Sequence, residues 1–129
     1  MRSALAIMLA LASPAHAQDL GEGEAAFVAH CAVCHGPEAR GDGPMSPLLN
    51  LRPADLTQLS LANDGQFPAA RIIRRVDGTT EMLAHGGPMP VFGPLLQGPS
   101  ASMVGPDGSD LVAPETILNI AAWLETVQQ

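Results

Sequence analysis

The sequence has few of the residues from which small proteins usually build a core or a covalent framework. Its 129 residues include two cysteines, one tryptophan, three phenylalanines and no tyrosine. Glycine and proline contribute 25 residues (13 Gly and 12 Pro), so long loops are expected. The two cysteines lie three positions apart and close too small a ring to staple a fold. Such a chain needs another source of burial, and a large apolar cofactor would supply it.

The chain also lacks lysine, and its charge is one-sided. Six arginines stand against thirteen Asp and Glu residues, which gives a formal net charge of −7. Loss of Arg2 with a leader peptide would leave five arginines against thirteen acids, or 5 − 13 = −8. Binding of nucleic-acid phosphates needs a basic stripe, so the composition excludes nucleic acid as a partner. A docking partner with a positive patch is the natural complement.

The N-terminal apolar run is too short to span a bilayer. It covers Ala4 to Ala12, follows a positive start at Arg2, and precedes the small-x-small pattern of residues 15–17. We therefore predict a signal peptide over residues 1–17, cleaved after Ala17, and a single domain over residues 18–129. An uncleaved anchor is the alternative. With cleavage, we expect export to the periplasm and no stable membrane anchor.

The hydrophobic pattern predicts an all-α class, because no alternating strand pattern is visible. We expect helices over residues 22–32, 54–61, 67–76 and 114–127. Phe27 and Val28 would form the apolar side of the first helix. The helix at 67–76 separates an apolar face from a cationic face of Arg71, Arg74 and Arg75. That cationic face could be solvated, or it could meet a carboxylate of a bound cofactor or a partner; Arg40 and Arg52 are alternatives for the carboxylate.

Residues 31–35 read C-A-V-C-H, the attachment pattern for haem c. Thiols one helical turn apart, on Cys31 and Cys34, can form thioethers with two vinyl groups on one edge of a porphyrin. The imidazole of His35 is then placed to bind the iron. A redox dithiol would require a β-α-β context. A zinc site would require a second ligand pair, which the remaining histidines do not supply at finger spacing.

Further motifs carry a family resemblance. Gly23 and Phe27 precede the attachment pattern in the order G-x-x-x-F-x-x-x-C-x-x-C-H-G, residues 89–93 read M-P-V-F-G, and Trp123 stands in the last helix. Over residues 23–129 the chain thus resembles the class I monohaem cytochromes c, and residues 41–57 resemble a bacterial subgroup of them. The resemblance implies a cytochrome c fold, with three to five helices and long loops wrapped around one covalently bound haem. It also implies that the first and last helices cross near Gly23.

The same resemblance implies that Met89 is the distal iron ligand. A thioether is a soft donor that suits haem iron, and the flanking Pro88 and Pro90 would hold the sulfur in place. Taken alone, a methionine is more commonly a core residue. His85, as a second histidine ligand, is a rival. Three other methionines are weaker candidates: Met45, Met82 and Met103.

Two further expectations concern loops. In the family a proline carbonyl shortly after the motif orients the proximal histidine; Pro44 is the nearest match here, and Pro47-Leu48 is the alternative. Residues 94–112 are longer than in compact family members, so we expect an inserted, exposed loop. Asp107 and Asp110 within it hint at cation binding, although two such acids commonly just form a turn.

Together these features predict a one-electron carrier in a periplasmic electron-transfer chain, with redox proteins as donors and acceptors. The iron would be held by His35 and Met89, and the haem c by Cys31 and Cys34. With both axial positions filled, the chain is not expected to be an enzyme. The alternative is a dedicated haem c subunit of an oxidoreductase, such as a dehydrogenase complex. A haem sensor or a peroxidase-like enzyme with a displaceable distal ligand is a third reading.

Overall fold

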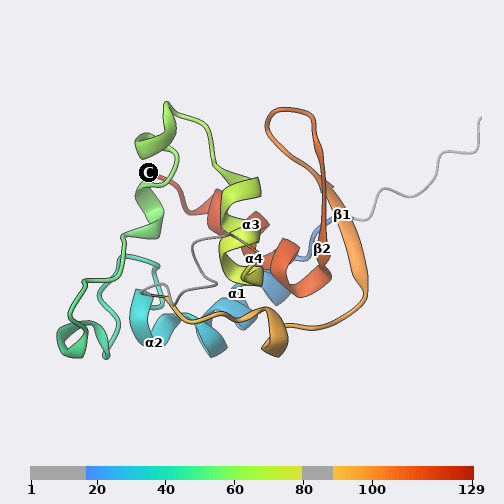
Figure 1. Cartoon of the computed structure of the whole chain (residues 1–129). Coiled ribbons are helices and arrows are strands. Elements are labelled where there is room, and N and C mark those ends of the chain that lie inside the picture. Colours follow the sequence, from blue (N-terminus) through green and yellow to red (C-terminus); the bar gives the residue numbers. More distant parts are fainter. Residues whose placement is uncertain (1–16, 80–88) are drawn as a thin grey trace, which may run out of the picture.

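Helices make up most of the regular structure in a computed structural model of the chain, which describes residues 17–79 and 89–129. The predicted signal peptide, except Ala17, and the rivals Met82 and His85 lie outside the described residues. The elements are α1 (Leu20–His30), α2 (Ala32–His35), α3 (Ala69–Asp77), β1 (Ser100–Val104), β2 (Asp110–Pro114) and α4 (Glu115–Thr126), shown in Figure 1. Within the described ranges, short 3₁₀ turns lie between them: η1 (Ser46–Leu48), η2 (Leu56–Gln58), η3 (Leu61–Asn63) and η5 (Gly93–Leu95). None of the described helices is long and apolar enough to cross a membrane.

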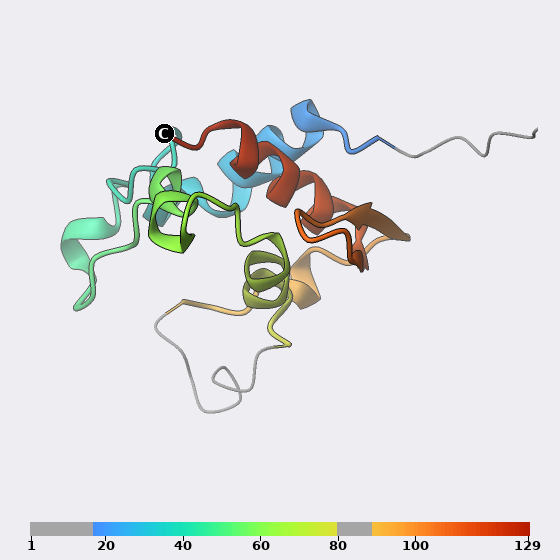
Figure 2. The same ribbon diagram turned by 90° about the horizontal axis from the view of Figure 1, so that it is seen from above.

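The first and last helices cross at Gly23, as predicted (Figure 2). A Cβ atom at this position would lie 2.6 Å from the carbonyl carbon of Asn119 and 3.1 Å from the Cβ of Trp123. One turn later, the rings of Phe27 and Trp123 pack with their centroids 4.7 Å apart. The Asn119 side chain is buried and accepts a hydrogen bond from the backbone N–H of Asp19, just before α1. The crossing therefore combines close backbone approach, aromatic packing and a hydrogen bond.

Helix α3 packs across α4 and has the two faces that its sequence predicts (Figure 1). Ile73 and Val76 are buried, while Arg71 and Arg74 are exposed. Arg75, also expected on the cationic face, is half-buried instead. The helix ends at Gly78, whose left-handed backbone (φ 84°) favours glycine. Helix α4 is buried on several sides, because α1 and α3 both pack against it.

The all-α expectation was wrong for residues 100–114, which form an antiparallel β-hairpin. Ala101 pairs with Ala113, and Met103 pairs with Leu111. These residues face α4, whereas their neighbours along each strand are exposed. The alternation was hard to recognise, because two of the four inward residues are alanines. The predicted inserted loop is therefore a hairpin that covers part of α4.

The hairpin turn explains Asp107 without a cation. Its carboxylate accepts hydrogen bonds from the backbone N–H of Ser109 (3.1 Å) and from the Ser109 hydroxyl (2.6 Å). These bonds lower the pKa of Asp107. The described residues contain no group of three potential metal-binding side chains. The acid therefore acts as a turn residue.

Other boundaries also differ from the prediction. The first helix is divided at Cys31 into α1 and α2, and Val28 is 49% exposed, so it does not belong to the apolar face. The helix expected over 54–61 is replaced by η2 and η3. The C terminus lies beside this segment (Figure 1), where Gln128 accepts from the backbone N–H of Ser60 and donates to the carbonyl of Leu56. These bonds fix the loop against the end of α4.

We predict that Gly23→Ala lowers the free energy of unfolding by about 1–3 kcal/mol, because the added methyl group overpacks the crossing. Alanine ordinarily stabilises a helix interior by up to about 1 kcal/mol relative to glycine, so the sign of the effect reports the crossing itself. Gly21→Ala is the matched control, since its Cβ would meet only Asp19, at an ordinary 3.4 Å. Denaturant titration measures both variants. Equal stabilities of the two proteins would contradict the close approach.

Candidate functional site

The C-x-x-C-H segment forms the helical turn α2 at the end of α1. The backbone N–H groups of Cys34 and His35 both donate to the carbonyl of Cys31, at 3.1 and 2.9 Å. Cys31 is buried, Cys34 and His35 are half-buried, and neither thiol is in a disulfide. Residues three and four apart are neighbours on a helix surface. The turn thus brings the two sulfurs and the imidazole together, as the motif predicts.

A loop over residues 41–45 holds this turn from outside. The backbone N–H groups of Gly41, Gly43 and Met45 donate to the carbonyls of His35, Cys34 and Val33, at 2.7, 3.1 and 2.9 Å. Carbonyls at the end of a helix lack partners within the helix, and this loop satisfies three of them. The result is a short helix whose end is fixed by backbone contacts rather than by side chains.

Gly43 is the closest point of that contact. A Cβ atom here would lie 2.5 Å from the carbonyl oxygen of Ala32 and 2.6 Å from the backbone of Cys34. Only a residue without a side chain lets the loop approach the motif so closely. Sequence reasoning did not identify this role, although the G-D-G-P pattern of residues 41–44 was visible.

The ring of His35 is oriented by the backbone carbonyl of Ala54, which lies 3.0 Å from Nδ1. The expectation of Pro44, or of Pro47-Leu48, was wrong: the chain makes a longer excursion, and the acceptor follows Pro53 instead. Donation from Nδ1 leaves Nε2 with a lone pair, the form that binds a metal. Burial lowers the pKa of His35, and the Ala54 hydrogen bond opposes that shift only in part. The imidazole is therefore held neutral and in one tautomer.

Beside this ring lies a small apolar cavity of about 50 Å³. It is lined by residues of α1, α2, η2, α3 and α4, and of the segment that follows residue 88. Its lining consists of Phe27, Cys31, His35, Leu56, Ile72, Arg75, Val76, Met89, Ile120 and Leu124. Residues distant in sequence, including the predicted ligands His35 and Met89, thus share one cavity.

Met89 is the one methionine among those described that lines the cavity. Met103 is buried in the hairpin, and Met45 is 39% exposed. The chain that follows Met89 is fixed to the end of α3, since the N–H of Phe92 donates to the carbonyl of Val76 at 3.2 Å. Gly93 continues this contact, because a Cβ atom there would lie 3.0 Å from the carbonyl carbon of Asp77. The M-P-V-F-G pattern therefore places Met89 at the cavity wall.

The environment of Cys31 suits a neutral or covalently modified sulfur. Burial, and to a smaller degree the nearby Cys34, raise the pKa of Cys31 to about 11. A neutral imidazole, a thioether and two sulfurs of one turn fit the donor set of a covalently attached haem.

Comparison with known families gives one result. A family model described as cytochrome c matches residues 20–128. No curated protein and no solved structure matches the chain.

We predict that Gly43→Ala lowers the free energy of unfolding by about 1–3 kcal/mol, because its methyl group would overlap the backbone of the motif. In a domain of this size, each kcal/mol lowers the midpoint of thermal unfolding by about 4–8 °C. Gly98→Ala is the control, since nothing lies within 4 Å of its Cβ position. Thermal unfolding of both variants tests the contact. A wild-type midpoint for Gly43→Ala would show that the loop does not rest on the motif.

Proposed function

Because the chain belongs to the cytochrome c family, we propose that it is a one-electron carrier in a periplasmic chain, with haem c bound by the four residues of the candidate site. Proteins of this family bind one covalent haem c with iron and transfer electrons. In our proposal Cys31 and Cys34 hold the porphyrin by thioethers, His35 is the proximal ligand, and Met89 is the distal ligand.

The observation that carries this proposal is the shared cavity. His35 and Met89 line the same apolar space, together with the first of the two cysteines. When bound there, a haem supplies the gain and loss of one electron at its iron. The chain's own part is to fix the two axial side chains and to exclude water. With an imidazole and a thioether assigned to the two axial positions, no position remains for a substrate, which supports a carrier rather than an enzyme.

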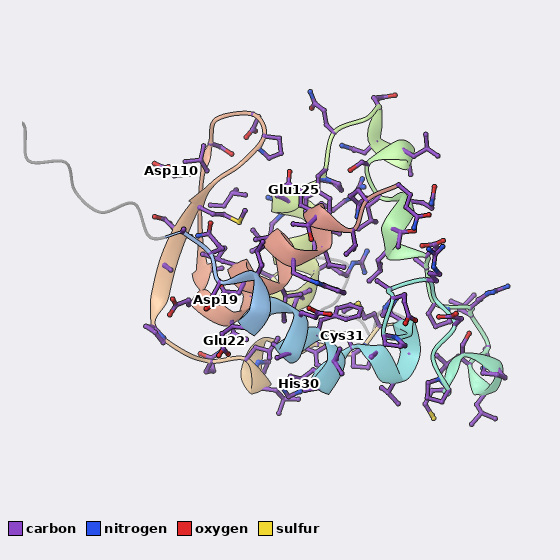
Figure 3. The ribbon with its side chains drawn as sticks, turned by 180° about the vertical axis from the view of Figure 1, so that it is seen from behind. Asp19, Glu22, His30, Cys31, Asp110 and Glu125 are labelled. Atoms are coloured by element: carbon purple, nitrogen blue, oxygen red, sulfur yellow. The ribbon has the colours of Figure 1, made fainter. Side chains whose placement is uncertain are left out.

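The distribution of exposed groups supports contact with protein partners. Asp19, which caps α1, and Glu22, in its first turn, are exposed acids at the end of the helix away from Cys31 (Figure 3). These charges favour a partner with a positive patch. Beside the motif the surface is different: residues 43–54 contain no acid, and Leu48 and Leu51 are 74% and 65% exposed.

That apolar loop is also the observation that favours the second candidate, a haem c subunit of an oxidoreductase complex. Exposed apolar residues next to a redox site are typical of a contact surface. If it is a free carrier, the protein is expected to elute as a small protein on gel filtration of a native extract, and the haem absorbance should appear in that fraction. Elution in a stable high-mass assembly would instead assign it to the complex.

We predict that Met89→Ala removes the sulfur-to-iron charge-transfer band and lowers the reduction potential. Axial ligands shift haem potentials over roughly 0.8 V, so a decrease on the order of 0.1 V or more is expected. Optical spectra and redox titration of the holoprotein measure both effects. Met45→Ala is the control for a methionine outside the cavity, and His85→Ala tests the rival ligand.

Three outcomes would contradict the proposal in different ways. If only His85→Ala changes the band and the potential, the distal ligand is His85. If the wild-type protein, made with competent maturation machinery, has the mass of its polypeptide alone, no haem is attached and the carrier function fails. If the haem is attached and Met89→Ala keeps the charge-transfer band, Met89 is not the distal ligand, although the haem is in place.

A further inference from the structure

The five arginines of the predicted mature domain have different surroundings. All five are described by the structure, and Arg75 is the one that lines the apolar cavity. Arg71 and Arg74, on the same helix α3, are exposed, as are Arg40 and Arg52 in the loops. The sequence did not decide which of these arginines could bind a carboxylate of the cofactor. Their positions in the structure favour Arg75, because it lines the cavity and the other four do not.

The surroundings of Arg75 offer little to compensate its charge. Its neighbours in the cavity lining are apolar side chains, a cysteine, a methionine and His35. Within the described ranges 17–79 and 89–129, the guanidinium makes no hydrogen bond or ion pair. A half-buried cation beside an apolar space is unfavourable unless it gains an anionic partner. The planar guanidinium, with its five N–H donors, is suited to bind a carboxylate through two parallel hydrogen bonds.

We propose that the Arg75 guanidinium binds a carboxylate of the haem held in this cavity, an inference that rests on the proposed function. A haem carries two propionate carboxylates, and neither can be buried in an apolar pocket without a cationic or polar partner. Arg75 is then a positioning residue: it fixes the orientation of the porphyrin and partly neutralises the carboxylate. A positive charge near the iron also favours the reduced state, so Arg75 raises the reduction potential.

The first test compares Arg75→Gln with Arg74→Gln, the matched loss of one positive charge from the exposed face of the same helix. At a fixed applied potential, Arg75→Gln is expected to lower the ratio of reduced to oxidised haem about tenfold, a shift of about 59 mV for one electron. Arg74→Gln should change this ratio less than about twofold, because water and salt screen an exposed charge. Equal shifts in the two variants would overturn the proposal.

A second test keeps the charge and so avoids variants that fail to mature. Arg75→Lys retains the cation but loses the two-fold hydrogen-bonding geometry. Resonance Raman spectra of the holoprotein should then show a shifted propionate bending band in Arg75→Lys and an unchanged band in Arg74→Lys. An unchanged band in both variants would overturn the assignment, whatever the potentials.

These outcomes separate the inference from the function on which it rests. If the wild-type protein contains no covalent haem, the proposed function itself fails and Arg75 loses its ligand. If the haem is attached and Met89-ligated, while the Arg75 and Arg74 variants behave alike in both tests, the carrier function stands and only the role of Arg75 is refuted.

Discussion

The close approach of α1 and α4 at Gly23 is the contact on which the candidate site depends. Because Gly23 has no side chain, α1 lies directly against the backbone of Asn119. Phe27 and Trp123 then pack one turn further on. Phe27 also lines the cavity, as does Ile120 of α4. The motif begins four residues after Phe27, so the crossing sets the position of the cysteines and histidine relative to the opposite wall. A shift of the crossing would change both walls of the cavity together.

Loops, rather than regular structure, complete the site, as expected of a chain so rich in glycine and proline. The loop over residues 41–45 satisfies the end of α2, and the carbonyl of Ala54 orients His35. The segment that contains Ala54 is held in place because the N–H of Leu56 donates to the carbonyl of Ala39 at 2.7 Å. Each of these bonds joins two backbone groups or a backbone group and a ring nitrogen. The site thus requires few specific side chains outside the ligands, which suits a sequence with only four aromatic residues.

Features with a local pattern could be predicted from the sequence, and features that depend on distant contacts could not. The motif at 31–35 and the amphipathic helix α3 each have a spacing that carries physical meaning, and the crossing at Gly23 was implied by the family resemblance. The hairpin at 100–114 was not predicted because two of its four inward-facing residues are alanines. The partner of His35 escaped because a carbonyl nineteen residues away has no sequence signature. Val28 was misplaced because one helix has several apolar residues but only one face against α4.

The charged side chains that the structure describes fall into two groups, those on the surface and the one at the cavity wall. A single exposed charge contributes only about 1 kcal/mol at contact distance in water, so in the proposed carrier the acids of the surface would act on association with partners rather than on the iron. The imidazole of His35 and the thioether of Met89, the ligands proposed above, are neutral groups, and ligand identity governs haem potentials over roughly 0.8 V. Substitutions of the surface acids can therefore adapt the protein to a partner without altering the redox site. Conversely, Arg75 is the one charged side chain among the described residues that lines the cavity, so in the proposed holoprotein its charge would act on the cofactor rather than only on a partner.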